Sequence, residues 1–144
     1  MSGTQTTQTI RVLGQVEPHT VHVLVDGGST LNFIQTQVAR KLGLVHSPSP
    51  QLKVIVGNGE ELLSNHVCRG VKLSIQGHNF EVDLHTLALS GIGIVLGTPW
   101  LKTLGPVLMN YGTLTMKFAH AQQQVELKGE QGPITSSISY NQLK

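Results

Sequence analysis

The stretch that decides the fold is Val21-His22-Val23-Leu24-Val25-Asp26-Gly27-Gly28-Ser29-Thr30. A valine-rich apolar run ends on an aspartate, and two glycines follow at once. The pattern predicts a buried strand that delivers a carboxylate to a turn, where glycine readily takes a positive φ. The only other aspartate in the chain is Asp83. If Asp26 does acid–base chemistry as one of a matched pair, a second copy of the chain must supply the other carboxylate.

Length and composition indicate a single globular domain with few surface charges. The chain has 144 residues, of which 39% are hydrophobic and only 12% charged, about half the usual charged share. So few charges suit a protein that assembles with other chains, and equally a compact β domain that stays alone. The ten lysines and arginines form no run. We therefore predict no direct nucleic-acid partner and no membrane binding.

Cysteine and histidine usage argues against a metal site. Cys68 is the only cysteine, so no intrachain disulfide can form. None of the seven histidines shows the close paired spacing typical of a zinc site. The amino-terminal residues are polar, and no apolar run approaches the ~18 residues of a membrane span. We expect no metal, no cofactor and a cytoplasmic location.

Short apolar runs between glycine-rich turns predict a mostly β fold with one clear helix and a short second helix. The clear helix is predicted over Asn32–Leu42, where apolar residues recur at helical spacing and Gly43 supplies a stop. The short helix begins at Thr98-Pro99 and runs through Leu104. Turns are predicted over residues 14–20 and 47–50. The predicted strands are Thr9–Leu13, Val21–Val25, Leu52–Val56, Glu61–Ser64, Val67–Ile75, Phe80–Leu84, Ile92–Leu96, Leu114–Phe118 and Val125–Leu127.

Two of the turns carry hairpin signals. Gly57-Asn58-Gly59 separates two strand-like runs, and Asn-Gly favours a tight hairpin turn. Gln76-Gly77-His78-Asn79 separates a second pair of runs. In the strand that follows, Asp83 alternates with apolar residues and is predicted to face water. We expect a folded domain over residues 9–128, with flexible segments over 1–8 and 129–144.

Three blocks of sequence, in this order and spacing, resemble the retropepsins, the single-lobe aspartic proteases of retroviruses and retrotransposons. They are Leu24-Val25-Asp26-Gly27-Gly28-Ser29-Thr30 with Asn32-Phe33-Ile34, Val56-Gly57-Asn58-Gly59-Glu60, and Ile94-Val95-Leu96-Gly97 followed by Trp100-Leu101. The likeness is strongest to the protease segment of gypsy-type long-terminal-repeat retrotransposon polyproteins and spans residues 9–127. It implies a single-lobe acid-protease β-barrel that works as a homodimer.

The resemblance implies a role for each matching residue. Asp26, Gly27 and Gly28 would form the catalytic loop, where two Asp26 carboxylates share a proton and activate a water. Ser29, Thr30, Ile94 and Val95 would contact an extended polypeptide substrate, and the flap above it would be Val56, Gly57, Asn58 and Gly59. The segment Ile94–Gly97 is also expected to fill the core beneath the active-site loop and to shape the nearby pocket wall. The implied activity is aspartic endopeptidase cleavage of a Gag–Pol-type polyprotein inside the cell, including inside virus-like particles.

Gly27 departs from the family pattern, which has serine or threonine at this position. In the family that hydroxyl helps to lock the two active-site loops together across the dimer. The departure leaves open a catalytically weak or inactive dimer used for peptide binding or polyprotein assembly. A further alternative is the same fold in a ubiquitin-linked shuttle or similar cellular protease, although Leu101-Lys102-Thr103-Leu104-Gly105-Pro106 favours the retrotransposon. A nucleophilic Ser29 is discounted because no Gly-x-Ser-x-Gly elbow is present.

Overall fold

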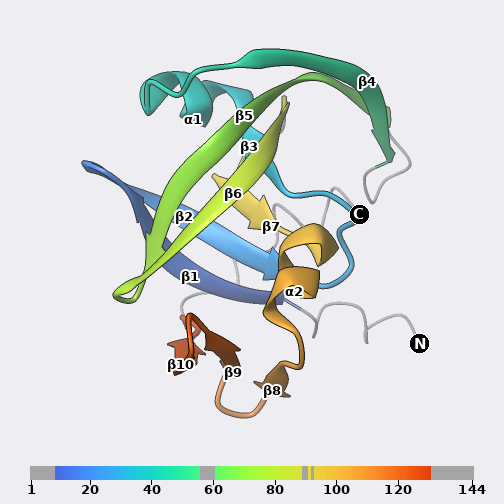
Figure 1. The fold of residues 1–144 in the computed structure, drawn as a ribbon. Helices are drawn as coiled ribbons and strands as arrows, with labels where there is room; N and C mark the ends of the chain where they lie inside the picture. The colour runs from blue at the N-terminus through green and yellow to red at the C-terminus, as the bar shows by residue number, and fades with distance from the viewer. Residues whose placement is uncertain (1–8, 56–60, 89–90, 92, 131–144) are drawn as a thin grey trace.

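The structure is a computed structural model that describes residues 9–55, 61–88, 91 and 93–130. Strands predominate, and two short helices interrupt them among the described residues (Figure 1). The predicted mostly β class is therefore confirmed. The elements in chain order are β1 (Thr9–Val16), β2 (His19–Asp26), β3 (Phe33–Gln35), α1 (Thr36–Lys41), β4 (Ser47–Ile55), β5 (Glu61–Ile75), β6 (His78–Leu87), β7 (Ile94–Leu96), α2 (Thr98–Leu104), β8 (Leu108–Asn110), β9 (Thr115–His120) and β10 (Gln123–Lys128).

The larger sheet closes on itself. It has seven strands in the order β1-β2-β7-β3-β6-β5-β4, and β5 also pairs with β1. The closing pairs are Gly14 with Ile75 and Gln15 with Ser74. Gly14 suits this position because an added Cβ would lie 2.9 Å from Leu73 Cδ1 and 3.3 Å from the Ser74 carbonyl oxygen. The strands β1, β2, β7, β3, β6 and β5 thus form a closed ring of hydrogen-bonded neighbours, in keeping with the predicted barrel.

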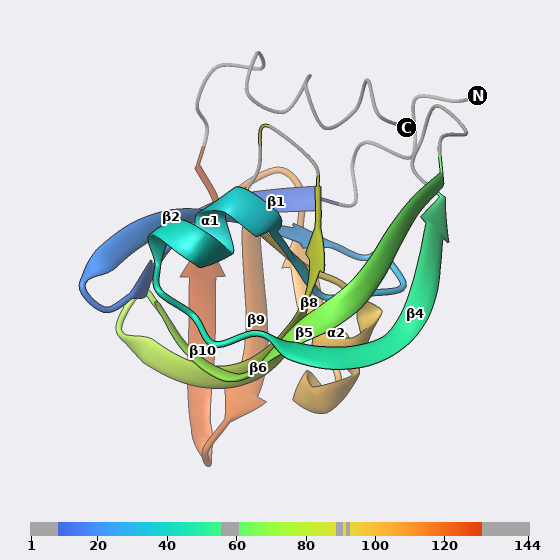
Figure 2. The same ribbon diagram turned by 90° about the horizontal axis from the view of Figure 1, so that it is seen from above.

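The strand β4 lies outside this ring and pairs with the amino-terminal half of β5. Figures 1 and 2 show the two strands extending together as an arm away from the ring. The predicted flap tip, Gly57-Asn58-Gly59, falls between them and lies outside the described residues. The strand pairing that leads up to it is described as far as Ile55 opposite Glu61.

The smaller sheet, in the order β10-β9-β8, covers one side of the ring. Apolar residues of β9 and β10 are buried in the same cluster as Ile10 and Val12 of β1. Trp100 of α2 joins this core, with its ring in edge-to-face contact with Phe80 at 5.4 Å and Phe118 at 6.1 Å between centroids. Burying large apolar side chains supplies about 1.5–3 kcal/mol each, so this cluster is the main stabilising feature of the fold. Trp100 is thus part of the hydrophobic core, with 3% of its surface exposed.

The predicted helix over Asn32–Leu42 is wrong in its first part. Residues Phe33–Gln35 form β3, and α1 covers Thr36–Lys41. Phe33 pairs with His85 of β6 on one side and with Val95 of β7 on the other. Sheet pairing on both sides satisfies the backbone groups of this short apolar run, whose periodicity alone does not separate strand from helix.

The predicted turns over 14–20 and 47–50 are also wrong in extent. The ladder between β1 and β2 continues to Val16 opposite His19, which leaves Glu17 and Pro18 as the turn. Residues 47–50 begin β4 instead of forming a turn. Proline is tolerated in β4 because this is an edge strand of the described sheet, and its pairing with β5 shifts register between Pro48 and Leu52. The short strand β8 was not predicted.

Other local predictions are confirmed. The second helix, α2, covers Thr98–Leu104 and carries proline in its first turn. The hairpin between β5 and β6 turns at Gln76 and Gly77, which have φ values of 50° and 86°. The predicted strands Leu114–Phe118 and Val125–Leu127 correspond to β9 and β10, which pair as a hairpin. Asp83 faces water as predicted, since its side chain is 54% exposed and lies 3.5 Å from that of Arg69.

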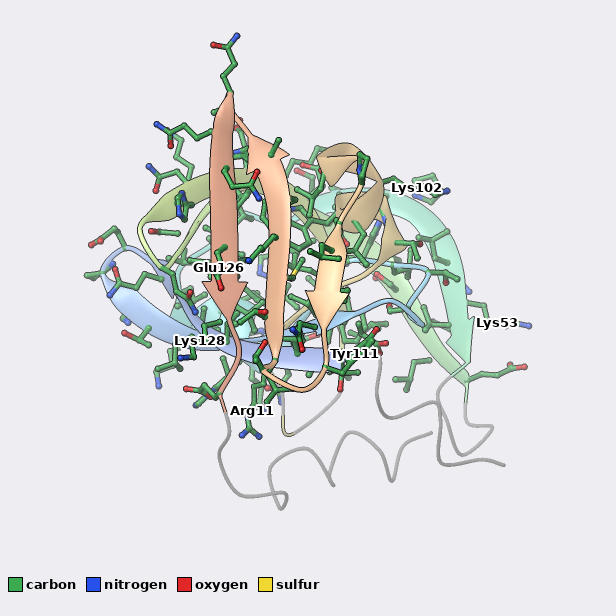
Figure 3. All side chains as sticks on the ribbon, turned by 90° about the horizontal axis from the view of Figure 1, so that it is seen from below. Arg11, Lys53, Lys102, Tyr111, Glu126 and Lys128 are labelled. Carbon is green, nitrogen blue, oxygen red and sulfur yellow. The ribbon has the colours of Figure 1, made fainter. Side chains whose placement is uncertain are left out.

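The charged side chains of the described residues are spread over the molecule. Figure 3 labels Arg11 on β1, Lys53 on β4, Lys102 on α2 and Lys128 on β10, each on a different element. Within the described part of the chain, neither helix has the length and apolar character needed to cross a membrane.

Candidate active site

Asp26 is the last residue of β2 and is almost completely buried. Its strand lies between β1 and β7 in the closed ring. The residue is only 1% exposed, and the Gly28 amide donates a hydrogen bond to Asp26 Oδ1 at 2.8 Å. A carboxylate removed from water is costly unless donors compensate it. The Gly28 amide therefore helps to hold the Asp26 carboxylate at this strand end.

The two glycines after Asp26 are not used as predicted. Neither has a positive φ, since the positive-φ glycines of the described residues are Gly43, Gly70, Gly77, Gly91 and Gly105. Instead, a Cβ added to Gly28 would lie 3.3 Å from Asp26 Oδ1, which is closer than ordinary van der Waals contact. Gly28 therefore permits the close approach of amide and carboxylate. Gly27 is exposed beside it and brings no side-chain oxygen to the loop.

The loop after Asp26 is folded by its own hydrogen bonds. The Ser29 amide donates to the Asp26 carbonyl oxygen at 3.1 Å, and the Ser29 hydroxyl donates to the Leu31 carbonyl oxygen at 2.7 Å. The hydroxyl of Ser29 is thus engaged within the loop, while Thr30 is exposed. Contact of these two residues with a substrate stays a prediction.

A second segment, around Gly97, packs tightly against this loop. A Cβ added to Gly97 would lie 2.5 Å from the carbonyl oxygens of both Ser29 and Leu31. The Thr98 amide donates to the Ser29 carbonyl oxygen at 2.9 Å. The Gly97 amide donates to Oδ1 of Asn32 at 2.8 Å in a buried position. The loop that follows the aspartate is therefore fixed from both sides, by its own bonds and by the residues that begin α2.

Sequence reasoning assigned no function to Asn32, which appeared as the start of a predicted helix and within one block of the resemblance. A signal was available, since a lone polar residue stands between Leu31 and Phe33 where the chain becomes buried. A buried amide must find hydrogen-bond partners. Such a position beside a candidate catalytic loop is a candidate for a structural tie.

A small apolar cluster lies next to the Asp26 loop. Its buried members come from four neighbouring strands, and its partly buried members come from the loop and from the β4–β5 arm. The buried members are Leu24, Phe33, Leu87 and Val95, and the partly buried ones are Leu31, Val54 and Leu62. Val95 belongs to this cluster, whereas Ile94 is buried in the main core. Val95 and Ile94 were both predicted to contact substrate from β7. Val95 lies in the same cluster as Val54 and Leu62 of the β4–β5 arm, whereas Ile94 fills the main core.

A cavity of about 290 Å³ adjoins the end of the loop, and it is lined in part by Asn32, Asp83, His85, Trp100 and Thr103. The ring nitrogen Nδ1 of His85 is buried without a hydrogen-bond partner among the described residues. Burial lowers the pKa of His85 below its ordinary value, the charge of Arg69 lowers it further, and Asp83 opposes them. No group of three or more histidine, cysteine, aspartate or glutamate residues in the described part of the chain could hold a metal ion.

Solved structures similar to this one share its fold. The retroviral protease-like domain of Ddi1 from Leishmania major has a TM-score of 0.63 at 9% identity, over 85% of this chain and 94% of that chain. A retropepsin-like aspartic protease from Rickettsia conorii has a TM-score of 0.52 at 18% identity, over 71% and 84%. EIAV protease complexed with the inhibitor HBY-793 has a TM-score of 0.50 at 17% identity, over 69% and 91%. The fold is that of the retropepsin-like aspartic proteases.

The sequence itself identifies the family. The profile of the PEG10/RTL1 protease domain matches residues 22–126, which is most of the chain. The chain therefore belongs to the PEG10/RTL1 protease domain family, a group of gypsy-derived retrotransposon proteases. The predicted resemblance is confirmed, and the matched segment includes Asp26, Asn32 and Gly97. No curated protein sequence matches the chain.

Proposed function

We propose that this chain is an aspartic endopeptidase that acts as a homodimer on a Gag–Pol-type polyprotein in the cytoplasm. The observation that carries the proposal is the buried Asp26 at the end of β2, held by the Gly28 amide, in a chain of a protease family. The other aspartate, Asp83, is exposed and engaged by Arg69 and by the Gly70 amide. A symmetric dimer would pair Asp26 with its own copy.

In the proposed reaction, one Asp26 carboxylate is ionised and takes a proton from a water, whose oxygen attacks the scissile carbonyl carbon. Its twin is protonated and donates to the carbonyl oxygen, which gives a tetrahedral gem-diol. The first Asp26 then passes its newly gained proton to the leaving nitrogen as the C–N bond breaks, and its twin takes a proton back from one of the gem-diol hydroxyls. Two carboxylates held close together share a proton because ionising both is opposed by like-charge repulsion, an effect for which the aspartic-protease pair is the type example.

The apolar cluster beside the loop supports a preference for apolar side chains in the substrate. Leu31, Val54 and Leu62 are partly buried and lie over a floor that includes Val95. An extended peptide placed there would bury further apolar surface, at about 25 cal/mol per Å². The proposed flap, Val56 with Gly57-Asn58-Gly59, would close over that peptide and exclude water.

The central experiment is cleavage of a polyprotein segment with apolar junctions at mildly acidic pH. The Asp26→Asn variant is expected to lose activity by about 10²–10⁴-fold, because a general acid–base group contributes a factor of that size. Asp83→Asn is the matched control, since it removes the same charge from an exposed position, and it should cleave like the wild type. Equal cleavage by Asp26→Asn and the wild type would exclude the proposed mechanism.

A second candidate function is a dimer that binds peptide or assists polyprotein assembly without cleaving it. The observation that favours it is Gly27, which leaves the loop without the hydroxyl that the family places there. Gly27→Ser separates the two candidates. A protease weakened by its glycine should gain dimer stability or cleavage rate with serine, whereas a binding module should gain no cleavage activity.

A further inference from the structure

We propose that Asn32 is a positioning residue, whose side-chain carbonyl holds the Asp26 loop against Gly97. This inference rests on the proposed function, because the position of the loop matters most if two Asp26 carboxylates must meet. Asn32 is only 8% exposed. Its Oδ1 atom faces the Gly97 amide at 2.8 Å, and an N–H donor can be satisfied only by the oxygen of the side-chain amide.

The backbone of Asn32 is fixed independently of this bond. Its carbonyl oxygen accepts a hydrogen bond from the His85 amide of β6 at 3.0 Å, directly before β3 pairs with β6 at Phe33 opposite His85. The side chain therefore projects from a rigid strand start. The Asn32 side chain therefore holds the Gly97 amide in a fixed position relative to the sheet.

The loop is tied to the residues that begin α2 by two hydrogen bonds. One joins backbone groups, the Thr98 amide and the Ser29 carbonyl oxygen, at 2.9 Å. The other is the bond from Gly97 to Asn32, and it is the tie that a substitution can remove. The Ser29 amide also donates a hydrogen bond to the Asp26 carbonyl oxygen. A displacement of the loop at Ser29 would therefore also displace Asp26.

Loss of the tie should affect the chemical step more than substrate binding. The proposed mechanism needs two carboxylates at hydrogen-bonding distance, and a misplacement of about 1 Å can cost about 100-fold in rate. Asn32 is almost completely buried, so it has little surface with which to contact the proposed peptide. Replacing it should therefore lower kcat while KM stays near the wild-type value.

Three variants test this directly. Asn32→Asp keeps an acceptor oxygen, Asn32→Leu fills the space without one, and Asn32→Ala leaves the space open. We expect kcat to fall by about 10-fold in the leucine and alanine variants, as for a buried donor left unsatisfied. The aspartate variant should keep more activity than the leucine variant. The pH profile of kcat in Asn32→Asp should also shift, because the substitution places a further carboxylate beside the Asp26 loop.

The open cavity allows chemical rescue. Acetamide has the carbonyl and the size of the deleted group, so it should restore kcat in Asn32→Ala and have no effect on Asn32→Leu. If the only role of Asn32 were to fill space, Asn32→Leu would instead have a higher kcat than Asn32→Ala. Equal kcat in all variants, or no response of Asn32→Ala to acetamide, would overturn the proposal.

Hydrogen exchange gives a readout that does not depend on cleavage. In Asn32→Leu, the amides of Ser29 and Thr98 should lose about 10-fold of their protection, whereas an amide of strand β5, such as that of Leu73, should not change. If the wild type cleaves nothing, the proposed function fails, yet this measurement still decides whether Asn32 holds the loop. Unchanged protection at Ser29 and Thr98 would show that it does not.

Discussion

Replacing Gly97 by alanine tests the packing on which the candidate site depends. The new Cβ would lie 2.5 Å from the carbonyl oxygens of Ser29 and Leu31, and 3.0 Å from Ser29 Cβ, whereas real Cβ contacts below 3.0 Å essentially do not occur. Both oxygens belong to the backbone, so no side-chain rotation relieves the contact. The loop and the start of α2 must move apart, and the Gly97 and Thr98 hydrogen bonds to the loop lengthen.

The expected cost is at the upper end for an overpacked core position, about 3 kcal/mol. For a domain of this size that corresponds to a fall in Tm of roughly 10 °C. Because the displaced loop carries Asp26, we also expect cleavage to fall by about 10- to 100-fold at a temperature where the variant is folded. Thermal denaturation followed by circular dichroism measures the first effect, and cleavage of the polyprotein segment measures the second.

Gly105→Ala is the matched control. Gly105 ends α2 with a φ of +71°, and an added Cβ there would meet no atom within 4 Å. The backbone of Gly105, at φ +71° and ψ −146°, lies in a region that only glycine adopts readily. Gly105→Ala should therefore lose about 1–3 kcal/mol of stability through backbone strain, with cleavage unchanged. A Gly97→Ala variant as stable and as active as the wild type would refute the reasoning, because the loop would then have room that the structure does not give it.

Three further outcomes are expected. Trp100→Ala should lose about 3–5 kcal/mol in urea unfolding, since it empties a buried site between Phe80 and Phe118; a loss below 1 kcal/mol would contradict this packing. Gln76→Ala should lose about 1 kcal/mol, because the Gln76 amide both donates to and accepts from the backbone of Lys128; an unchanged urea midpoint would count against that clasp. The pKa of His85 is lowered in the folded state from 6.5, so unfolded chains bind more protons and wild-type stability should fall as the pH drops below about 6.5. His85→Gln should show a smaller fall between pH 7.5 and 5, and an identical pH dependence would contradict the assignment.

The general fold could be predicted because its signals are local. The strand that ends at Asp26, the turn at Gln76-Gly77 and the proline that opens α2 each depend on residues adjacent in sequence. The order of the matching blocks then indicated the family, which the sequence profile confirms.

The remaining features could not be predicted because they depend on distant residues. Phe33–Gln35 is a strand because β6 and β7 supply partners on both sides, and nothing near residue 33 indicates those partners. Gly14 stays within a strand because Leu73 crosses beside it.

The site shows the same limit. Asp26 and Gly28 were predicted as site residues from a pattern of adjacent residues, whereas the hydrogen bond between Asn32 and Gly97 spans 65 positions of the chain. The reason for the glycines was also missed, since close approach and not positive φ accounts for Gly28.

The central claim is that one active site is built from two copies of Asp26. Isothermal titration of the full chain with a statine-type inhibitor, which mimics the attacked peptide bond, measures this directly. The account predicts saturation at one inhibitor per two chains, with binding lost in Asp26→Asn and kept in Asp83→Asn. Saturation at one inhibitor per chain, or binding of equal strength by Asp26→Asn, would contradict it.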